Sequence, residues 1–294
     1  MSARASALTA LAAVLSAFTL CAASALAAGA GSANPGAPVT VEGQIRPDAV
    51  RARVQAYMRS VPAGPHDESI GRWRAPICPL VGGLSRDQAE LILRRLSEVA
   101  VSVGAPLGPE KCRPNLYVLA AADPKAMLKE WSAKEADLFG DRPGARADLF
   151  IKTDRPVRVW HNASSVPEDG RVMARNDTRY NGSPMQPHAN DSRIVENTGR
   201  FTSSVIVVLD PSVAKVKIGQ LADYIALTSF TEVDQNADIG DTPSILQLFR
   251  DKAEAPPGLT AWDAAYLKAL YDVPPNVRLQ RMLIANGMEK RVVR

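Results

Sequence analysis

The amino-acid sequence predicts an α/β fold of the α+β kind, with a mixed β-sheet packed against helices. Two apolar runs, 115–121 and 201–209, have the composition of buried strands, and the second is rich in β-branched side chains. An Asp-Pro pair follows each run and precedes a helical pattern, so strands and helices alternate along the chain. From about residue 242 to 294 the patterns are helical only, which predicts a helical C-terminal tail.

The strongest local signals lie before the first strand. Apolar residues at helical spacing predict a helix over 47–59, and the stretch 62–75 is interpreted as a loop. Ser85 and Gln88 have the spacing of a capping box, which predicts the start of the clearest helix. The apolar face of that helix consists of Ala89, Ile92, Leu93, Leu96, Val99 and Ala100. After the strand, Asp123-Pro124 caps and begins a helix that continues to about Lys134.

The middle of the chain combines weak and strong strand signals. Residues 157–160 predict a short strand, and the polar stretch 163–190 predicts a long exposed hairpin or loop. Residues 217–233 follow the strand at 201–209 and predict a helix with one buried face.

Three short helices are predicted in the C-terminal tail. Thr242-Pro243 starts the first, and Thr260 with Asp263 caps the second. Asn276 starts the last, and Gly287 ends it. A Pro-rich link, 253–258, separates the first two. Residues 45–294 are therefore expected to form one domain that includes this tail.

The N-terminus has the pattern of a secretory signal peptide. Arg4 supplies one positive charge, 7–20 is almost wholly apolar, and Ala25-Leu26-Ala27 matches a signal-peptidase site. We expect cleavage after Ala27, a flexible segment over 28–44, and a periplasmic or secreted protein without a membrane span. Lipid modification at Cys21 is the alternative, which Leu20 before it disfavours.

Composition excludes some function classes. Lys and Arg total 35 against 31 Asp and Glu, so the formal net charge is only +4, and the two signs are interspersed. This distribution gives no support for nucleic-acid binding. Cys78 and Cys112 remain after signal cleavage, and in an oxidising compartment they are expected to form a disulfide. Metal ligation and a reactive thiol are the alternatives, but neither cysteine belongs to a Cys-x-x-Cys motif.

Three short motifs carry a resemblance to known proteins: Cys112-Arg113-Pro114-Asn115, the run 155–160, and Gly219-Gln220-Leu221-Ala222-Asp223-Tyr224-Ile225-Ala226. With them, the chain resembles a family of exported bacterial proteins of unknown function over about 72–285. The order of elements distantly resembles zincin-type metallopeptidases. This resemblance implies a zincin-like order of strands and helices and a degenerate peptidase cleft.

A zincin needs His-Glu-x-x-His on one helix, where two His bind zinc and the Glu activates its water. The matching helix here places Gln220, Leu221 and Tyr224 at those positions. None of the three side chains suits its role, so the resemblance implies a pseudoenzyme that has lost its metal site. We expect no cofactor. Asp223, Tyr224, Trp160 and His161, with Gln220, are the candidate cleft residues, although a solvated helix face also explains Asp223 and Tyr224.

The three histidines offer a weaker alternative. His66 and His188 lie in polar stretches, and His161 ends the predicted strand at 157–160. Solvated histidines are the simpler interpretation of the first two. A zinc site built from His161, His188 and a carboxylate remains the alternative.

A run of oxygen-bearing side chains suggests a calcium loop: Asp234, Asn236, Asp238 and Asp241. It begins like an EF-hand loop, but Ile239 stands where that loop needs Gly and Ile245 where it needs a bidentate Glu. A polar connection is therefore the simpler interpretation, with an irregular Ca²⁺ site as the alternative.

The sequence contains no Gly-x-Ser-x-Gly elbow, Walker loop or dinucleotide fingerprint. We therefore expect a non-catalytic exported protein that binds a polypeptide or a cell-envelope component. A peptide would add along the strand near Val157–Trp160. The rivals are a hydrolase that uses Asp223, Tyr224 and His161, and a purely structural envelope protein.

Overall fold

The computed structural model describes residues 47–64, 68–140, 144–167, 198–250 and 255–293. The signal-peptide pattern, Cys21 and the segment 28–44 lie outside these ranges, as do His66, His188 and most of the stretch 163–190. Residues 45–294 form one compact unit. Within the described ranges, no helix is both long enough and apolar enough to cross a membrane.

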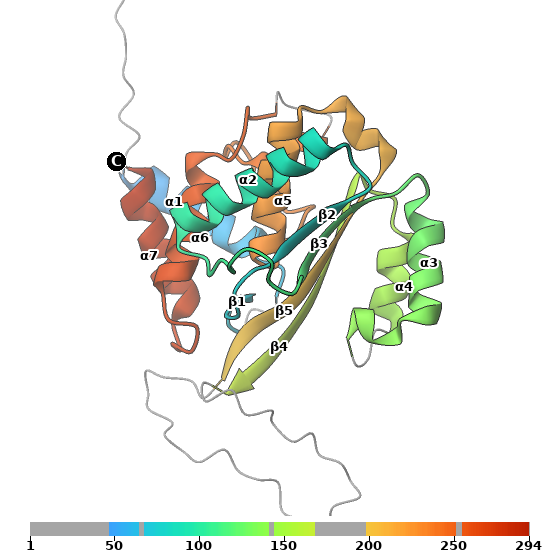
Figure 1. Ribbon diagram of the computed structural model, residues 1–294. Coiled ribbons are helices and arrows are strands. Elements are labelled where there is room, and N and C mark those ends of the chain that lie inside the picture. The colour runs from blue at the N-terminus through green and yellow to red at the C-terminus, as the bar shows by residue number, and fades with distance from the viewer. Residues whose placement is uncertain (1–46, 65–67, 141–143, 168–197, 251–254, 294) are drawn as a thin grey trace, which may run out of the picture. The chain divides into compact units, whose positions relative to one another are not determined.

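The described strands form one mixed sheet (Figure 1). It consists of β1 (Arg72–Trp73), β2 (Pro79–Gly82), β3 (Leu116–Ala120), β4 (Val157–Pro167) and β5 (Thr198–Leu209). β4 pairs with β5 antiparallel along its whole length, whereas β1 and β3 pair with β5 in parallel. Since β4 occupies one edge of β5, β1 and β3 must follow one another along the opposite edge. β2 then pairs in parallel with β3 and ends the sheet.

Helices cover both faces of this sheet (Figure 1). One face packs against α1 (Pro47–Ser60), α2 (Arg86–Val103), α5 (Ile218–Phe230), α6 (Ala261–Asp272) and α7 (Gln280–Val292). The other face packs against α3 (Pro124–Lys134) and α4 (Gly144–Lys152), with the 3₁₀ helix η1 (Ala136–Phe139) between them. Two further 3₁₀ helices, η2 (Pro211–Lys215) and η3 (Ile245–Phe249), precede and follow α5. The predicted α/β fold with a helical C-terminal region is therefore confirmed.

The two predicted capping boxes are present. Ser85 and Gln88 form the capping box of α2, and Thr260 and Asp263 form that of α6. Such caps satisfy backbone N–H groups that have no partner within the helix, each contributing about 1 kcal/mol. Asp263 is fully buried, and its carboxylate also accepts hydrogen bonds from the Ser244 hydroxyl, the Tyr57 hydroxyl and Ile245 N. One carboxylate therefore joins α1, η3 and α6.

Several predicted boundaries are wrong. β4 is not a short strand over 157–160 but continues to Pro167, because pairing with β5 holds residues whose polar composition resembles a loop. The helix predicted over 217–233 ends at Phe230, because Thr231 and Val233 form bridges to Arg72 and Pro62.

The last helix also differs from its prediction. It starts at Gln280 and runs through Gly287, which was expected to end it. A Cβ at Gly287 would lie only 3.0 Å from Ala269 Cβ, so this glycine permits α6 and α7 to approach closely. The helix predicted from Thr242-Pro243 is η3, capped by Ser244.

Two strands and one α-helix were missed. β1 lies within the predicted loop 62–75, and β2 contains Pro79 and Gly82, which weaken a strand signal. Pro79 is tolerated because it is the first residue of a strand at the end of the sheet. α4 packs Ala147 against Trp160 and neighbouring aromatic rings.

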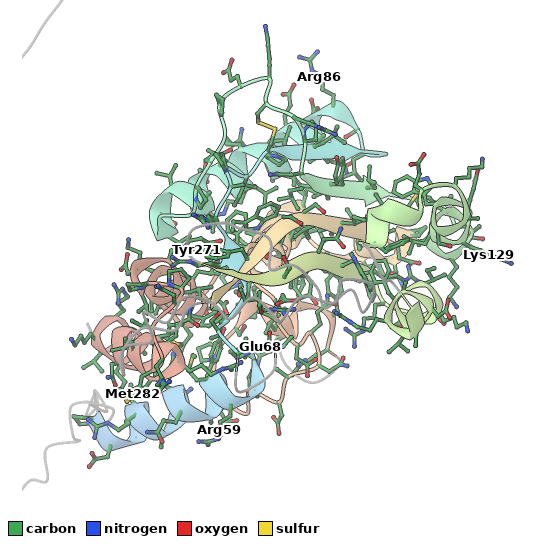
Figure 2. All side chains as sticks on the ribbon, turned by 90° about the horizontal axis from the view of Figure 1, so that it is seen from below. Arg59, Glu68, Arg86, Lys129, Tyr271 and Met282 are labelled. Carbon is green, nitrogen blue, oxygen red and sulfur yellow. A yellow bond between two sulfur atoms is a disulfide. The ribbon has the colours of Figure 1, made fainter. Side chains whose placement is uncertain are left out.

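The predicted disulfide joins Cys78 to Cys112, with 5.9 Å between their Cα atoms, and appears as a yellow bond in Figure 2. Cys78 precedes β2, and Cys112 precedes β3. Asn115 supports the same connection, because its side chain accepts from Cys78 N and donates to Pro76 O. The bridge therefore holds together the amino ends of two adjacent strands.

We predict that Cys112→Ser lowers the free energy of unfolding by about 2–5 kcal/mol, because the loop between the cysteines is no longer closed in the unfolded chain. Urea denaturation measures this loss. The double variant Cys78→Ser/Cys112→Ser is the matched control and should be about as unstable as the single variant. Alkylation of both cysteines in the native protein without reductant would contradict the bridge.

Candidate functional site

The three residues that occupy the metal-site positions of the zincin motif lie on α5, and each has a structural role. Gln220 donates its amide to Pro256 O at 2.7 Å, and Leu221 is 2% exposed. The Tyr224 hydroxyl accepts a hydrogen bond from the Gln235 amide at 2.9 Å, and its ring lies edge-on to Phe249. Burial raises the pKa of Tyr224 to about 12, so the phenol stays protonated at neutral pH. This side chain suits neither a metal ligand nor a base.

Asp223 does not lie on a solvated helix face. Its side chain is only 6% exposed, forms an ion pair with Arg95 of α2, and accepts a hydrogen bond from Leu259 N at 2.8 Å. The reason is that all ten residues from Leu221 to Phe230 are buried, since α5 is packed between the sheet and other helices. Polar residues in this helix therefore serve as internal links between elements.

His161 and Trp160 lie on opposite faces of β4, as strand geometry requires of neighbours. The His161 ring places Nε2 2.8 Å from Thr228 O, so Nε2 carries the proton and donates it. Its Nδ1 is buried without a partner in the described part of the chain. Burial lowers the pKa of His161 below its ordinary value. Trp160 instead packs against Phe139 and Phe150, with ring centroids 5.3 Å and 5.5 Å away.

The candidate cleft residues therefore do not form one site. Asp223 bonds to α2, Tyr224 to Gln235, and His161 to the end of α5. Trp160 belongs to the core on the α3 and α4 side. Within the described ranges, no group of three or more His, Cys, Asp or Glu side chains is placed to hold a metal ion.

In the proposed calcium loop, carboxylates accept hydrogen bonds from backbone N–H groups of the same loop. Asp234 accepts from Asn236 N at 2.8 Å, and Asp238 accepts from Gly240 N at 3.1 Å. These are side-chain turns of the kind that Asp forms in polar connections. The carbonyl of Asp241 accepts from Arg53 Nη2 of α1. The carboxylates of Asp234 and Asp238 are thus each turned toward the loop's own backbone.

Sequence analysis missed a partly buried ion cluster beside His161. Arg200 donates Nη2 to Glu232 Oε1 and Nη1 to Glu68 Oε2, both at 3.0 Å. Burial raises the pKa of Glu232, but the hydrogen bonds from Arg200 and nearby positive charge lower it by more, so this pKa lies below its ordinary value. A Cβ at Gly71 would lie 2.6 Å from Glu232 Oε2, so a larger residue there would displace this carboxylate. The partners are far apart in sequence, so no local pattern marks them.

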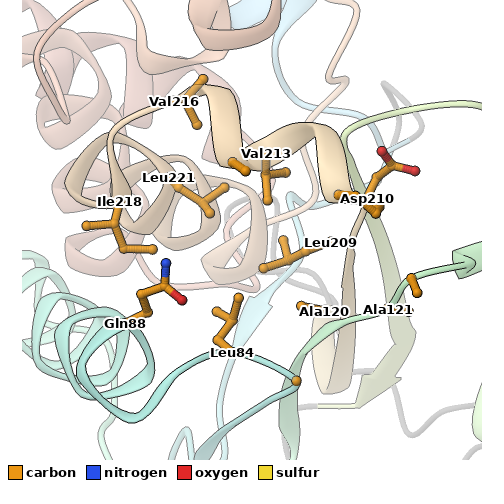
Figure 3. Close-up of a pocket in the computed structure, with 14 residues that line it drawn as sticks. Leu84, Gln88, Ala120, Ala121, Leu209, Asp210, Val213, Val216, Ile218 and Leu221 are labelled. Atoms are coloured by element: carbon orange, nitrogen blue, oxygen red, sulfur yellow. The ribbon is translucent and has the colours of Figure 1, made fainter.

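A pocket of about 430 Å³ opens at the carboxyl ends of β2, β3 and β5 (Figure 3). Its walls are mainly apolar, and Leu84, Leu209, Val213, Ile218 and Leu221 contribute side chains. Of the predicted site residues, only Leu221 lines it. Sequence analysis missed this pocket, although its position outside the carboxyl ends of parallel strands is where α/β sheets generally bind ligands.

The outer edge of β4 is a second candidate. Asp210 N donates to Pro156 O across the start of the β4–β5 pair. Antiparallel pairing alternates, so even-numbered residues of β4 face β5 and odd-numbered residues direct their amides and carbonyls outward. The outward positions include Val159, His161 and Ala163. No other described strand pairs with β4.

Comparisons of the chain with protein-family models, with curated proteins and with solved structures give no match. The functional argument therefore depends on the geometry of the pocket and of the β4 edge.

We predict that Asp223→Asn lowers the free energy of unfolding by about 2–4 kcal/mol, because Arg95 loses its buried carboxylate partner and one of the two acceptor oxygens becomes an NH₂ donor. Thermal and urea denaturation measure this. Glu98→Gln is the matched control: Glu98 also pairs with Arg95, at 3.0 Å, but is half exposed, so its loss should cost less than about 1 kcal/mol. Equal effects of the two substitutions would contradict the structural role of Asp223.

We predict that His161 makes the fold acid-sensitive. Its pKa is lower in the folded protein than the ordinary value of 6.5, so its contribution to stability is complete above that value. This contribution is lost as pH falls through the folded pKa, at up to about 1.4 kcal/mol per pH unit. His161→Gln should therefore lose less stability than the wild type between pH 7 and pH 5. An unchanged slope in His161→Gln would refute the prediction.

Proposed function

We propose that this protein is an exported, non-catalytic binding protein that takes up an extended polypeptide as an added strand on the outer edge of β4. The observation that carries the proposal is the length of β4, whose eleven residues pair with β5 and with no other described strand. The signal-peptide pattern and the disulfide support export.

The backbone of β4 is suited to strand addition. Val159, His161, Ala163 and Ser165 direct N–H and C=O groups outward, as the register with β5 requires. A bulge at Ser203 of β5 is the only irregularity in the register, and it leaves the alternation along β4 intact. An added strand would form main-chain hydrogen bonds at these positions, which supply affinity that depends little on the sequence of the peptide.

Side chains beside this edge would select among peptides. On the α5 side, Ser165 donates to Glu68, which also pairs with Arg200 and is 41% exposed. On the α4 side, the Arg146 guanidinium lies 5.2 Å from the centre of the Trp160 ring. A bound strand would place alternate side chains near one or the other of these groups. These contacts would therefore favour a peptide that carries both charged and aromatic side chains, on alternate positions of the strand.

No comparable observation supports the hydrolase alternative. It requires Asp223, Tyr224 and His161 to act on one substrate, and each is bonded to a different part of the fold. A purely structural envelope protein remains distinguishable by experiment, because it would select no peptides.

We predict that Ala163→Pro weakens peptide binding at least about fivefold, because it removes an outward N–H without touching the β4–β5 ladder. Peptides are selected from a displayed random library on the immobilised wild-type protein, and their affinities are then compared by calorimetry. Peptide binding should also slow hydrogen exchange at Val159, His161 and Ser165.

Ser164→Pro is the matched control for the register. Ser164 lies opposite Phe201 and faces β5, so proline there should remove a ladder bond and cost about 2 kcal/mol or more. Ala163→Pro should leave stability nearly unchanged. Failure to select peptides would favour the structural alternative, and peptides that bind Ala163→Pro as tightly as wild type would exclude the β4 edge as their site.

A further inference from the structure

The pocket at the carboxyl ends of β2, β3 and β5 is a consequence of the chain path. The chain leaves β2 and β5 toward α2 and α5 on one face of the sheet, but leaves β3 toward α3 on the other face. Connections that diverge to opposite faces leave a crevice between them, and α/β proteins use this position for ligands. The volume of about 430 Å³ lies within the range of small-molecule sites.

Small residues keep this crevice open. Ala120, Ala121 and Ala122 line it at the end of β3, and Ala214 contributes from η2. Gly83 has φ of +78°, and a Cβ there would lie 2.1 Å from Ala120 O, so only glycine fits this turn between β2 and α2. Figure 3 shows Leu84, Leu209, Ile218 and Leu221 around the same space. The walls therefore suit an apolar body.

Gln88 supplies a directed polar group. Its Oε1 accepts from Ser85 N at 3.2 Å and from Ser85 Oγ at 3.1 Å, which fixes the orientation of the amide. Nε2 must then be the free end, and it donates to no residue in the described part of the chain. In Figure 3 the carboxamide lies on the side of the pocket that Leu84 and Ile218 also line. Gln88 is exposed, so this donor lies in contact with solvent at the edge of an apolar pocket, where a bound ligand could replace water as its acceptor.

Asp210 is the charged residue that lines the pocket, and it is already engaged. Its Oδ1 accepts from Ser212 N at 3.0 Å, and its side chain in Figure 3 points away from the apolar walls. Hydrogen bonds from the backbone and side chain of Ser212 lower the pKa of Asp210. The Gln88 amide, rather than this carboxylate, is therefore the polar side chain available to a ligand in the pocket.

We propose that this pocket binds a small molecule with an apolar body and a hydrogen-bond-accepting oxygen, with the oxygen held by Gln88 Nε2. This site is separate from the proposed peptide edge of β4 and does not depend on it.

The test uses three probes with the same six-carbon chain and different head groups: hexanamide, hexanoate and hexylamine. Each is titrated into the oxidised ¹⁵N-labelled protein at pH 7, and the amide resonances are followed. Hexanamide, hexanoate or both should shift Gly83, Leu84, Ala121 and Ala122 and bind at least about fivefold tighter than hexylamine. The difference between hexanamide and hexanoate tells whether the natural oxygen belongs to a carbonyl or a carboxylate.

Two variants distinguish binding in this pocket from nonspecific binding of alkyl chains elsewhere on the protein. Gln88→Glu keeps the acceptor needed by the capping box but replaces the donor with a carboxylate. It should reverse the order, so that hexylamine binds more tightly than hexanamide. Leu84→Phe narrows the cavity and should weaken binding of every probe at least about tenfold. Because glutamate also completes the capping box, Gln88→Glu is expected to fold. It therefore tests the proposal even if Leu84→Phe folds poorly.

Several outcomes would overturn the proposal. One is the absence of binding by any probe, and another is perturbation of residues away from the pocket. The acceptor chemistry is excluded if hexylamine binds wild type as tightly as hexanamide, or if Gln88→Glu keeps the wild-type order.

Discussion

The fold depends on β5, because this strand contacts its neighbouring strands in the sheet and the helices on both faces. β4 pairs along one edge, and β1 and β3 share the other. Residues Val205–Leu209 are at most 1% exposed, with alternate side chains in the two cores on opposite faces of the sheet. A substitution in this segment therefore affects both cores at once. The pocket and the β4 edge derive their geometry from the same strand, since β5 ends at the pocket and sets which groups of β4 face outward.

Short-range sequence patterns correctly predicted those helices whose starts depend on neighbouring residues. The capping residues Ser85, Asp123 and Thr260 marked three helix starts correctly, because a cap needs only neighbouring residues. Elements held by distant partners were missed or shortened. β2 is four residues long and begins with Pro79, and its strand geometry comes from pairing with β3. The polar half of β4 resembles a loop in sequence and becomes a strand only because β5 pairs with it.

The candidate site was less predictable for the same reason. Asp223 and Tyr224 have the composition of a functional helix face, but the sequence does not show that neighbouring elements cover that face. Asp223 meets Arg95 across 128 positions of chain, and Glu232 meets Arg200 across 32. The pocket combines residues from three connections, most of them small and apolar, so no motif marks it. Gln88 was recognised as a capping residue, and only the structure shows that its free amide end also lines a cavity.

The disulfide and the pocket lie at opposite ends of the same two strands. Cys78 and Cys112 join the amino ends of β2 and β3, whereas Gly83 and Ala120–Ala122 line the pocket where these strands finish. The covalent bond therefore restrains one end, and only ladder hydrogen bonds and side-chain packing restrain the other. Proteins open locally with free energies that range up to that of global unfolding, and the least restrained segments open first. Local separation of β2 from β3 is therefore expected to begin at the carboxyl ends, beside the pocket, and not at the end that the disulfide closes.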